Sequence, residues 1–364
     1  MQVREITSHI ESFAPLSFQE SYDNAGLQTG HPEQEVRGVL ICIDITDEVI
    51  EEALRLDANL IIAHHPLIFS GLKKLTGSNY TERLVIEAIR QNLSIYAAHT
   101  NLDAVHTGVN QKIGEKLGLK GTEVLVPMAD HLRKLVFFVP PDHAETVRQE
   151  IFKAGAGHIG DYDMCSFSTP GEGTFRGSEE SDPFAGEKGT LHTEPELRVE
   201  TIFPKERESR IIRALIRSHP YEEVAYDIYP LTNKYDRAGS GAIGELEKPL
   251  DEQSFLRLLK ERFNTPVIRH TGWIGRKIKR VALCGGSGSF LLSGAIASGA
   301  DAFISGDFKY HQFFDADRKI LVADIGHYES EQFTKEIFYD LLTKKFTKFA
   351  VHLSQVNTNP VNYF

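Results

Sequence analysis

Three stretches of the chain carry side chains that could hold metal ions. His64 and His65 follow the apolar run NLIIA, Asp103 lies in HTNLDAV, and His327 and Glu331 lie four residues apart in GHYESEQ. Three imidazoles and two carboxylates are too many ligands for one tetrahedral ion, and they suffice for two ions that share a bridging acid. Nitrogen and oxygen ligands suit zinc, manganese, iron or cobalt better than calcium or magnesium. The sequence therefore predicts two divalent transition-metal ions per chain, with zinc as the leading choice.

The adjacent pair His64 and His65 has more than one interpretation. Successive residues of a regular strand point to opposite sides, so a strand could not aim both imidazoles at one ion. The pair must lie where the strand ends and the chain bends, which Pro66 helps to enforce, or else serve two different ions. The alternative is a pair of hydrogen-bonded turn histidines, and the pair alone does not separate these interpretations.

Asp103 and His99 stand together after the next apolar run. A loop aspartate more often bonds its own backbone, so Asp103 taken alone is better explained as a turn residue. His99 could be a metal ligand or could orient Asp103 from outside the ligand set, and taken alone it is better explained as structural.

His327 and Glu331 flank the start of a predicted helix. A spacing of four residues places two helical side chains on one face, one turn apart. Glu329 competes for the acid role, but a residue two positions on points about 200° around the helix from His327. The alternative is a histidine at a helix start beside a surface glutamate.

The segments that position these residues alternate between strands and helices. In the first part of the chain, apolar runs typical of buried strands span 38–45, 59–66 and 93–99, and amphipathic helices span 46–58 (capped by Thr46 or Asp47), 81–92 and 108–119. This alternation predicts a parallel sheet covered on both faces. The carboxyl ends of such strands open onto the functional crevice, and the candidate ligands lie at those ends.

The same alternation of strands and helices returns after residue 240. Strands are predicted at 278–286, 301–307 and 319–327, and helices at 289–300 and 329–346. The two parts can be aligned without a gap, because Cys42 precedes Ala58 by sixteen residues and Cys284 precedes Ala300 by the same number. In this alignment His64-His65 corresponds to Gly306-Asp307. One strand later, His99 with Asp103 corresponds to His327 with Glu331. The pattern predicts an α/β fold with two duplicated lobes, residues 1–126 and 234–364.

The piece between the lobes, 127–233, follows a different pattern. Its predicted strands span 134–140, 163–169, 197–204 and 223–231, and its helices span 142–155 and 205–219. Strand, helix, two strands, helix, strand is the ferredoxin-like α+β arrangement, with a four-stranded antiparallel sheet. The polar, Gly-rich segment 170–190 predicts an exposed loop or a long hairpin tip.

Composition narrows the class of protein. The 364 residues are 41% apolar and 25% charged, as in an ordinary globular protein of two or three domains. No apolar run approaches the roughly 18–20 residues of a membrane span, and the start MQVREITSHIESF predicts no export signal. Three scattered cysteines without a CxxC suit a reducing compartment, so we expect a cytoplasmic protein. A net charge of −11 argues against general nucleic-acid binding.

The motifs resemble those of a known family. HHPLIF (64–69), HTNLDAV (99–105) and GHYESEQ (326–332) look like the Nif3-like family, also called the GTP cyclohydrolase 1 type 2 homologue family; DNAGLQ (23–28) and GDFKYHQ (306–312) match it too. The resemblance covers essentially the whole chain. The middle piece, with HPYEEVAYDIYPL (219–231), resembles the PII/CutA-like module of the longer bacterial members. Asp307-Phe308 departs from the family pattern, which often has Glu-Ile there.

The resemblance implies a dinuclear metal site. It places the first two ligands on His64 and His65, the first-lobe carboxylate on Asp103, and the second-lobe pair on His327 and Glu331. It also implies a toroidal homohexamer whose metal sites face an inner cavity, with the insertion near the openings. A GTP cyclohydrolase activity is attached to the family largely by homology, so the family name does not identify the substrate.

Two classes of function fit these residues. The first is a metal-dependent hydrolase of a nucleotide or related small molecule, with His99 and His311 as candidate acid/base groups. The second is a non-catalytic metal-binding or regulatory protein in which the insertion senses a ligand. An open coordination position would favour the enzyme. The GSGS run (286–289) could also cradle a phosphate, although short Gly/Ser turns are common.

Overall fold

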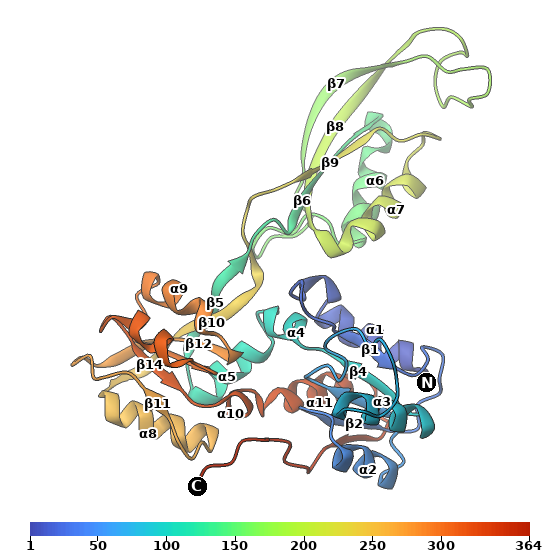
Figure 1. The fold of residues 1–364 in the computed structure, drawn as a ribbon. Helices are drawn as coiled ribbons and strands as arrows, with labels where there is room; N and C mark the ends of the chain where they lie inside the picture. The colour runs from blue at the N-terminus through green and yellow to red at the C-terminus, as the bar shows by residue number, and fades with distance from the viewer. The chain divides into compact units, whose positions relative to one another are not determined.

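The structure, a computed structural model, describes residues 1–364 and divides into two compact units. The larger unit consists of Met1–Pro127 and Asp236–Phe364, and the smaller unit is Met128–Tyr235. Figure 1 shows the course of the chain through both. None of the helices combines the length and the apolarity that crossing a bilayer requires.

The first sheet of the larger unit has five strands in the order β1-β4-β3-β2-β15. The strands are β1 (Gly26–Thr29), β2 (Val39–Cys42), β3 (Leu60–Ala63), β4 (Ser94–Ala97) and β15 (Val351–Leu353). As predicted, β2, β3 and β4 are parallel and fully buried. The crossover helices α2 (Asp47–Arg55) and α3 (Tyr80–Arg90) contribute to one apolar core with these strands. Of the two predicted caps of α2, Thr46 is the one whose side chain accepts from the Val49 amide.

The second sheet has six strands in the order β11-β14-β13-β12-β10-β5. They are β5 (Lys120–Met128), β10 (Tyr235–Leu250), β11 (Arg269–His270), β12 (Ile278–Ser287), β13 (Ala302–Gly306) and β14 (Leu321–Asp324). The central strands β12, β13 and β14 are parallel, in the same chain order as β2, β3 and β4. Both sheets thus present a set of carboxyl strand ends.

The remaining helical segments of the larger unit lie before, between and after these strands. They are α1 (Val3–Phe13), η1 (Leu16–Phe18), α4 (Thr100–Ala104), α5 (Val109–Leu117), α8 (Glu252–Phe263), η3 (Ser289–Leu291), α9 (Leu292–Ala297), η4 (Tyr310–Ala316), α10 (His327–Glu331) and α11 (Thr334–Lys345). Two of them cross between the halves of the chain: α5 packs on β12, whereas α11 packs on β2 and β15. Each half therefore covers part of the other half's sheet.

The prediction of one continuous helix over 329–346 is wrong. The structure has a short helix α10 and a separate α11, with Gln332 and Phe333 between them. The Gln332 side-chain amide donates to the carbonyl oxygens of Glu329 and Phe263, at 2.9 and 2.8 Å. A side chain thus satisfies a carbonyl that the backbone of a continuous helix would have bonded. The break lets α10 carry the candidate ligands His327 and Glu331, while α11 packs on β2 and β15.

The smaller unit is a four-stranded antiparallel sheet in the order β7-β8-β6-β9. Its elements are β6 (Leu132–Val139), α6 (Pro141–Lys153), β7 (Phe167–Phe175), β8 (His192–Pro204), η2 (Lys205–Arg207), α7 (Glu208–Ser218) and β9 (Tyr226–Pro230). Side chains of α6 and α7 form one core with Leu135, Phe137 and Phe203 of the sheet. This unit therefore buries an apolar core of its own.

The bounds of the second predicted strand in this unit are wrong. The prediction placed a strand at 163–169 and a loop from 170, whereas β7 runs from Phe167 to Phe175 and pairs with β8 throughout. Pro170 and the glycines Gly171 and Gly173 made this segment look like a loop. Because β7 is an edge strand, a residue without an N–H donor is tolerated there, and the turn signal was misleading.

Candidate metal centre

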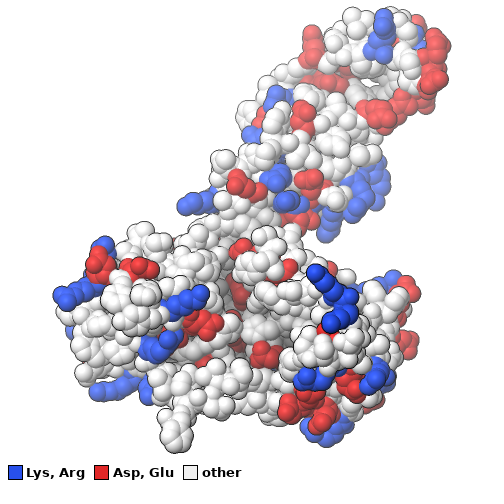
Figure 2. All heavy atoms as spheres, in the orientation of Figure 1, with Lys and Arg blue, Asp and Glu red and all other residues white.

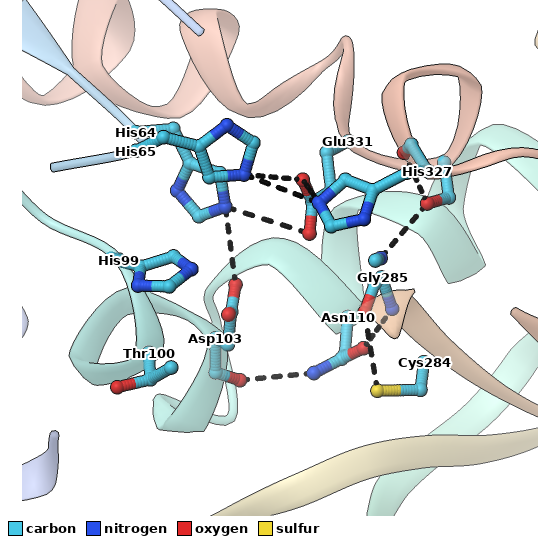
Figure 3. A network of polar contacts seen from close by, with 12 residues as sticks. His64, His65, His99, Thr100, Asp103, Asn110, Cys284, Gly285, His327 and Glu331 are labelled. Atoms are coloured by element: carbon cyan, nitrogen blue, oxygen red, sulfur yellow. Dashed lines mark hydrogen bonds and ion pairs between the residues drawn. The ribbon is translucent and has the colours of Figure 1, made fainter. Parts of the chain in front are cut away.

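The two adjacent histidines lie in the bend that follows β3. The strand ends at Ala63, and the rings of His64 and His65 are 4.8 Å apart between centroids and tilted by 42°. Figure 3 shows both rings directed toward Glu331. The Nδ1 of His64 donates to the carbonyl oxygen of Ala98 at 3.0 Å, so Nε2 is the nitrogen that faces the site. The bend thus aims two neighbouring imidazoles into one site.

Two buried atoms in this site have no hydrogen-bond partner. They are Nε2 of His64 and Oδ1 of Asp103, which lie 3.6 Å apart (Figure 3). Oε1 of Glu331 is 3.7 Å from the same nitrogen. Two ligands of one tetrahedral ion, each about 2.0–2.1 Å from it, are themselves about 3.3–3.5 Å apart. Buried polar atoms are rarely left unpaired, and these separations fit a shared cation.

Glu331 faces three histidines at once. Its Oε2 lies 3.0 Å from Nε2 of His65 and 3.1 Å from Nε2 of His327, while Oε1 faces His64. The helical spacing that predicted His327 and Glu331 on one face is realised on α10. The two Nε2 atoms of His65 and His327 are only 3.3 Å apart. One buried carboxylate therefore holds together a group of ligand atoms from both halves of the chain.

Two histidines of the cluster have strongly raised pKa values. Burial would lower the pKa of His65, but hydrogen bonds to Asp44 and Glu331 outweigh it and raise the pKa to about 10. Burial likewise opposes charge on His327, yet Asp307 and Glu331 raise its pKa to about 11. Two protonated imidazoles thus share one carboxylate oxygen, in a place where a divalent ion could replace their protons.

The two carboxylates of the cluster respond in opposite directions. Burial and the neighbouring Glu331 raise the pKa of Asp103. Burial would also raise the pKa of Glu331, but His64, His327 and His65 hold it well below its usual range. Glu331 is thus the ionised centre of the cluster, and Asp103 would gain most from a cation beside it.

Three aspartates that the sequence analysis did not single out hold the histidines in place. The pairs are Asp44 with His65, Asp307 with His327 and Asp23 with His99, at N···O distances of 2.7, 2.6 and 2.8 Å. A carboxylate that accepts from one ring nitrogen leaves the other free for a metal and fixes the ring's orientation. Asp44 and Asp307 follow the buried strands β2 and β13, so an acid just past an apolar strand was the available signal.

The two candidate acid/base histidines lie in different places. The ring centroid of His99 is 5.4 Å from that of His64 and 5.3 Å from that of His65. His311, in contrast, is exposed on η4 between the rings of Tyr310 and Phe314 and does not line the cavity at the cluster. The structure therefore brings His99 to the site and leaves His311 away from it.

The glycine-rich run at the carboxyl end of β12 uses three of its amides within the fold. The amides of Gly285, Gly286 and Gly288 donate to the side chains of Asn110, Ser330 and Ser305, respectively. The amides of Gly286 and Gly288 therefore join neighbouring elements, and the phosphate cradle at 286–289 stays a prediction. The glycines of the run also serve close packing: a Cβ on Gly286 would lie 2.3 Å from Oε1 of Glu331.

A cavity of about 1040 Å³ opens at the cluster. His65, His99, Asp103, His327 and Glu331 line it on the polar side. Its walls also carry four well-exposed aromatic side chains, Tyr22, Phe69, Phe290 and Tyr363. In Figure 2 the visible face of the larger unit is hollowed, with carboxylate groups inside the hollow. A small molecule could therefore reach the clustered ligand atoms.

Comparison with known proteins extends over the whole chain. The profile of the Duf34/NIF3 (NGG1p interacting factor 3) family matches residues 1–360. A protein of Halalkalibacterium halodurans is 39% identical over 358 residues, which cover 97% of this chain and 96% of the relative. A Bacillus subtilis protein is 38% identical over 370 residues, covering 99% and 98%. Both relatives carry the name GTP cyclohydrolase 1 type 2 homolog.

Solved structures agree with the sequence relatives. A Bacillus cereus protein described as related to NIF3 matches with a TM-score of 0.86 at 39% identity, covering 100% of this chain and 99% of the other. A Staphylococcus aureus protein matches with a TM-score of 0.79 at 28% identity and the same coverage. Family profile, relatives and fold thus point the same way, and the chain belongs to the Duf34/NIF3 family.

Proposed function

We propose that this protein binds two divalent transition-metal ions through His64, His65, Asp103, His327 and Glu331. The observation that carries the proposal is the pair of unpartnered buried atoms, Nε2 of His64 and Oδ1 of Asp103, facing each other beside Glu331. Glu331 presents one oxygen to His64 and the other to His65 and His327, as a bridging ligand would. Zinc is the first choice for this ligand set; iron, manganese and cobalt are the alternatives.

We further propose that the ions serve a hydrolytic reaction. Two bound ions would supply Lewis acidity and water of lowered pKa. The chain itself contributes His99, whose Nδ1 is engaged by Asp23 and whose ring lines the cavity. Asp23 also accepts from the amide of Thr100 at 3.0 Å, so the carboxylate is held from two sides. His99 is therefore oriented to exchange a proton with a substrate in the cavity.

The cavity supports a nucleotide or a related small molecule as the substrate. Exposed aromatic rings on a cavity wall offer stacking surfaces for a planar heterocycle. Tyr22 and Phe69 lie side by side on this wall, with ring centroids 6.3 Å apart. A long nucleic acid is a poorer fit, because Lys and Arg are interspersed with Asp and Glu on the visible face of the larger unit (Figure 2).

We propose two duplicated lobes with an inserted ferredoxin-like, PII/CutA-like domain as the architecture. The matching parallel sets β2-β3-β4 and β12-β13-β14 support the duplication, and His99 and His327 follow equivalent strands. The reciprocal packing of α5 and α11 supports it as well. The strand order β7-β8-β6-β9 is that of the ferredoxin-like fold. We expect a toroidal homohexamer, which light scattering of the purified protein would test.

One experiment separates the enzyme from a metal-binding regulator. Protein stripped with a chelator is reloaded with zinc, iron, manganese or cobalt, and each form is screened against nucleotides and other phosphoesters. The hydrolase proposal predicts turnover that requires metal and falls strongly in His99→Ala, while that variant still binds two ions. Two bound ions without any turnover would favour the regulatory alternative. Fewer than two bound ions would contradict the dinuclear centre itself.

A further inference from the structure

The C-terminal segment, residues 354–361, is fixed against the first sheet. After β15, the hydroxyl of Ser354 donates to Oε2 of Glu52 at 2.5 Å, and the amide of Gln355 donates to Oε1 at 3.1 Å. Glu52 is buried on α2, and Val356 packs on the same apolar core. The segment is therefore part of the folded unit rather than a frayed chain end.

Two adjacent residues of this segment bind opposite halves of the chain. The Thr358 hydroxyl donates to Oδ2 of Asp44, just past β2, at 2.6 Å. The Asn359 side-chain amide donates to Oε1 of Glu329, on α10, at 3.0 Å. Asn359 also lines the cavity, together with Asp44 and Glu329. The segment thus runs past the site and contacts both halves of the chain, at the loop after β2 and at α10.

Thr358 is connected to a candidate ligand through a single carboxylate. Asp44 accepts from Thr358 with one oxygen and from Nδ1 of His65 with the other. Holding both oxygens fixes the plane of the carboxylate, and that plane sets the direction from which it receives the imidazole N–H. The other nitrogen of His65 then points at Glu331. Thr358 is only 9% exposed, so water competes poorly with its hydroxyl for Asp44.

We propose that the C-terminal segment belongs to the metal centre and that Thr358 is a positioning residue, which orients His65 through Asp44. This inference rests on the proposed metal binding. A group that hydrogen-bonds to a metal ligand without touching the metal influences metal affinity, because it fixes the ligand's orientation and basicity. The contribution is specific to the hydroxyl: the methyl group of threonine takes no part in the chain of hydrogen bonds from Thr358 to Asp44 and His65.

The test compares Thr358→Val with Thr358→Ser in the full-length protein. Valine keeps the shape and removes the hydroxyl, whereas serine keeps the hydroxyl. Zinc affinity is measured by competition with a chromophoric chelator, and thermal melting of the metal-free proteins checks the fold. We expect Thr358→Val to bind zinc about tenfold more weakly, the lower end of the range for such partners, and Thr358→Ser to bind like the wild type. Thr343→Val makes the same change on α11, where the hydroxyl donates to the Tyr339 carbonyl, and should leave zinc affinity as in the wild type.

A second measurement does not depend on zinc affinity in the variant. Coupling between two sites is reciprocal, so zinc should slow amide hydrogen exchange in 354–361 of the wild type. If Thr358→Val binds zinc as tightly as the wild type, or if Thr358→Ser is as weak as Thr358→Val, the positioning role is wrong. If the wild type itself binds no metal, the proposed centre fails first and the inference falls with it.

Discussion

At the scale of single residues, the site is a set of imidazoles arranged around one buried carboxylate. Each histidine donates a hydrogen bond from one ring nitrogen to a backbone carbonyl or an aspartate, and its other ring nitrogen faces Glu331. The energetic problem is the buried charge of Glu331, which in the metal-free protein is balanced by protons on His65 and His327. A divalent ion would balance it with fixed coordination geometry instead.

Replacing Glu331 by alanine tests the central ligand. Without the bridging carboxylate, the histidines lose the group that gathers them, and we expect zinc affinity to fall by more than about 100-fold, beyond the loss for an outer-shell partner. Metal content per chain after dialysis measures the effect. The matched control is Glu336→Ala on α11, whose carboxylate pairs with Lys116 and Lys112. Two ions retained by Glu331→Ala at unchanged affinity would refute the assignment.

The pH dependence of metal uptake follows from the raised pKa values. His65 and His327, with pKa values of about 10 and about 11, are protonated at neutral pH and must lose their protons to bind a metal. Affinity should therefore rise with pH, by up to about two log units per pH unit if both protons leave. Calorimetry in buffers of different ionisation enthalpy counts the protons. Uptake without proton release would show that these imidazoles are not ligands.

At the scale of elements, the ends of parallel strands and one tight loop decide which side chains meet. The bend after β3, the short α4 after β4 and α10 after β14 each deliver part of the ligand set. The carboxyl end of β12 lies against Glu331, with Gly286 at φ +57°. A side chain at that position would be strained and would occupy the space of the carboxylate.

Gly286→Ala should therefore damage the site more than the fold. Its Cβ would lie 2.3 Å from Oε1 of Glu331, so the carboxylate must move, and the left-handed backbone adds about 1–2 kcal/mol of strain. We expect a lower melting temperature and weaker zinc binding. Gly299→Ala is the control, since it has φ +70° and open space around it, and should share the backbone strain alone. Equal zinc affinity in both variants would show that the clash is relieved without moving Glu331.

At the scale of the whole molecule, the two halves of the larger unit depend on one another. The helix α5 of the first half covers β12, and α11 with β15 of the second half completes the first sheet. The proposed ligands are divided in the same way, with His64 and His65 from one half and His327 and Glu331 from the other. The smaller unit, by contrast, has its own core between its sheet and two helices.

Two truncated proteins test this difference. Residues 128–235 expressed alone should unfold cooperatively, whereas residues 1–126 alone should not fold, because α11 and β15 would be missing. Joining residue 126 to residue 236 by a short linker should keep metal binding, since Gly239 packs directly on Val126 and Pro127. Urea unfolding followed by circular dichroism, with metal analysis of the joined protein, measures these outcomes. Aggregation of the joined protein and an unfolded 128–235 would indicate one shared core.

The sequence by itself determined the elements whose signals are local. Apolar runs and amphipathic periods located β2, β3, β4, α2 and α3 to within a few residues. They could do so because a buried strand or helix face requires apolar residues at regular spacing along the chain. The candidate ligands could be named for a similar reason: they stand at or just past the ends of predicted strands or, for Glu331, one helical turn beyond such a residue. Local signals failed where long-range partners decided the outcome, as in the edge strand β7 and the break between α10 and α11.

Only the tertiary structure decided which residues hydrogen-bond to the candidate ligands and orient them. Asp44 and Asp307 follow buried strands and Asp23 lies in a family motif, but their roles at the site arise from hydrogen bonds to rings that are 21, 20 and 76 residues away. Thr358 reaches Asp44 across 314 residues, so no local pattern could reveal it. Such contacts depend on how the sheets and the returning chain pack together, and that packing is set by the summed burial of distant surfaces rather than by any short segment.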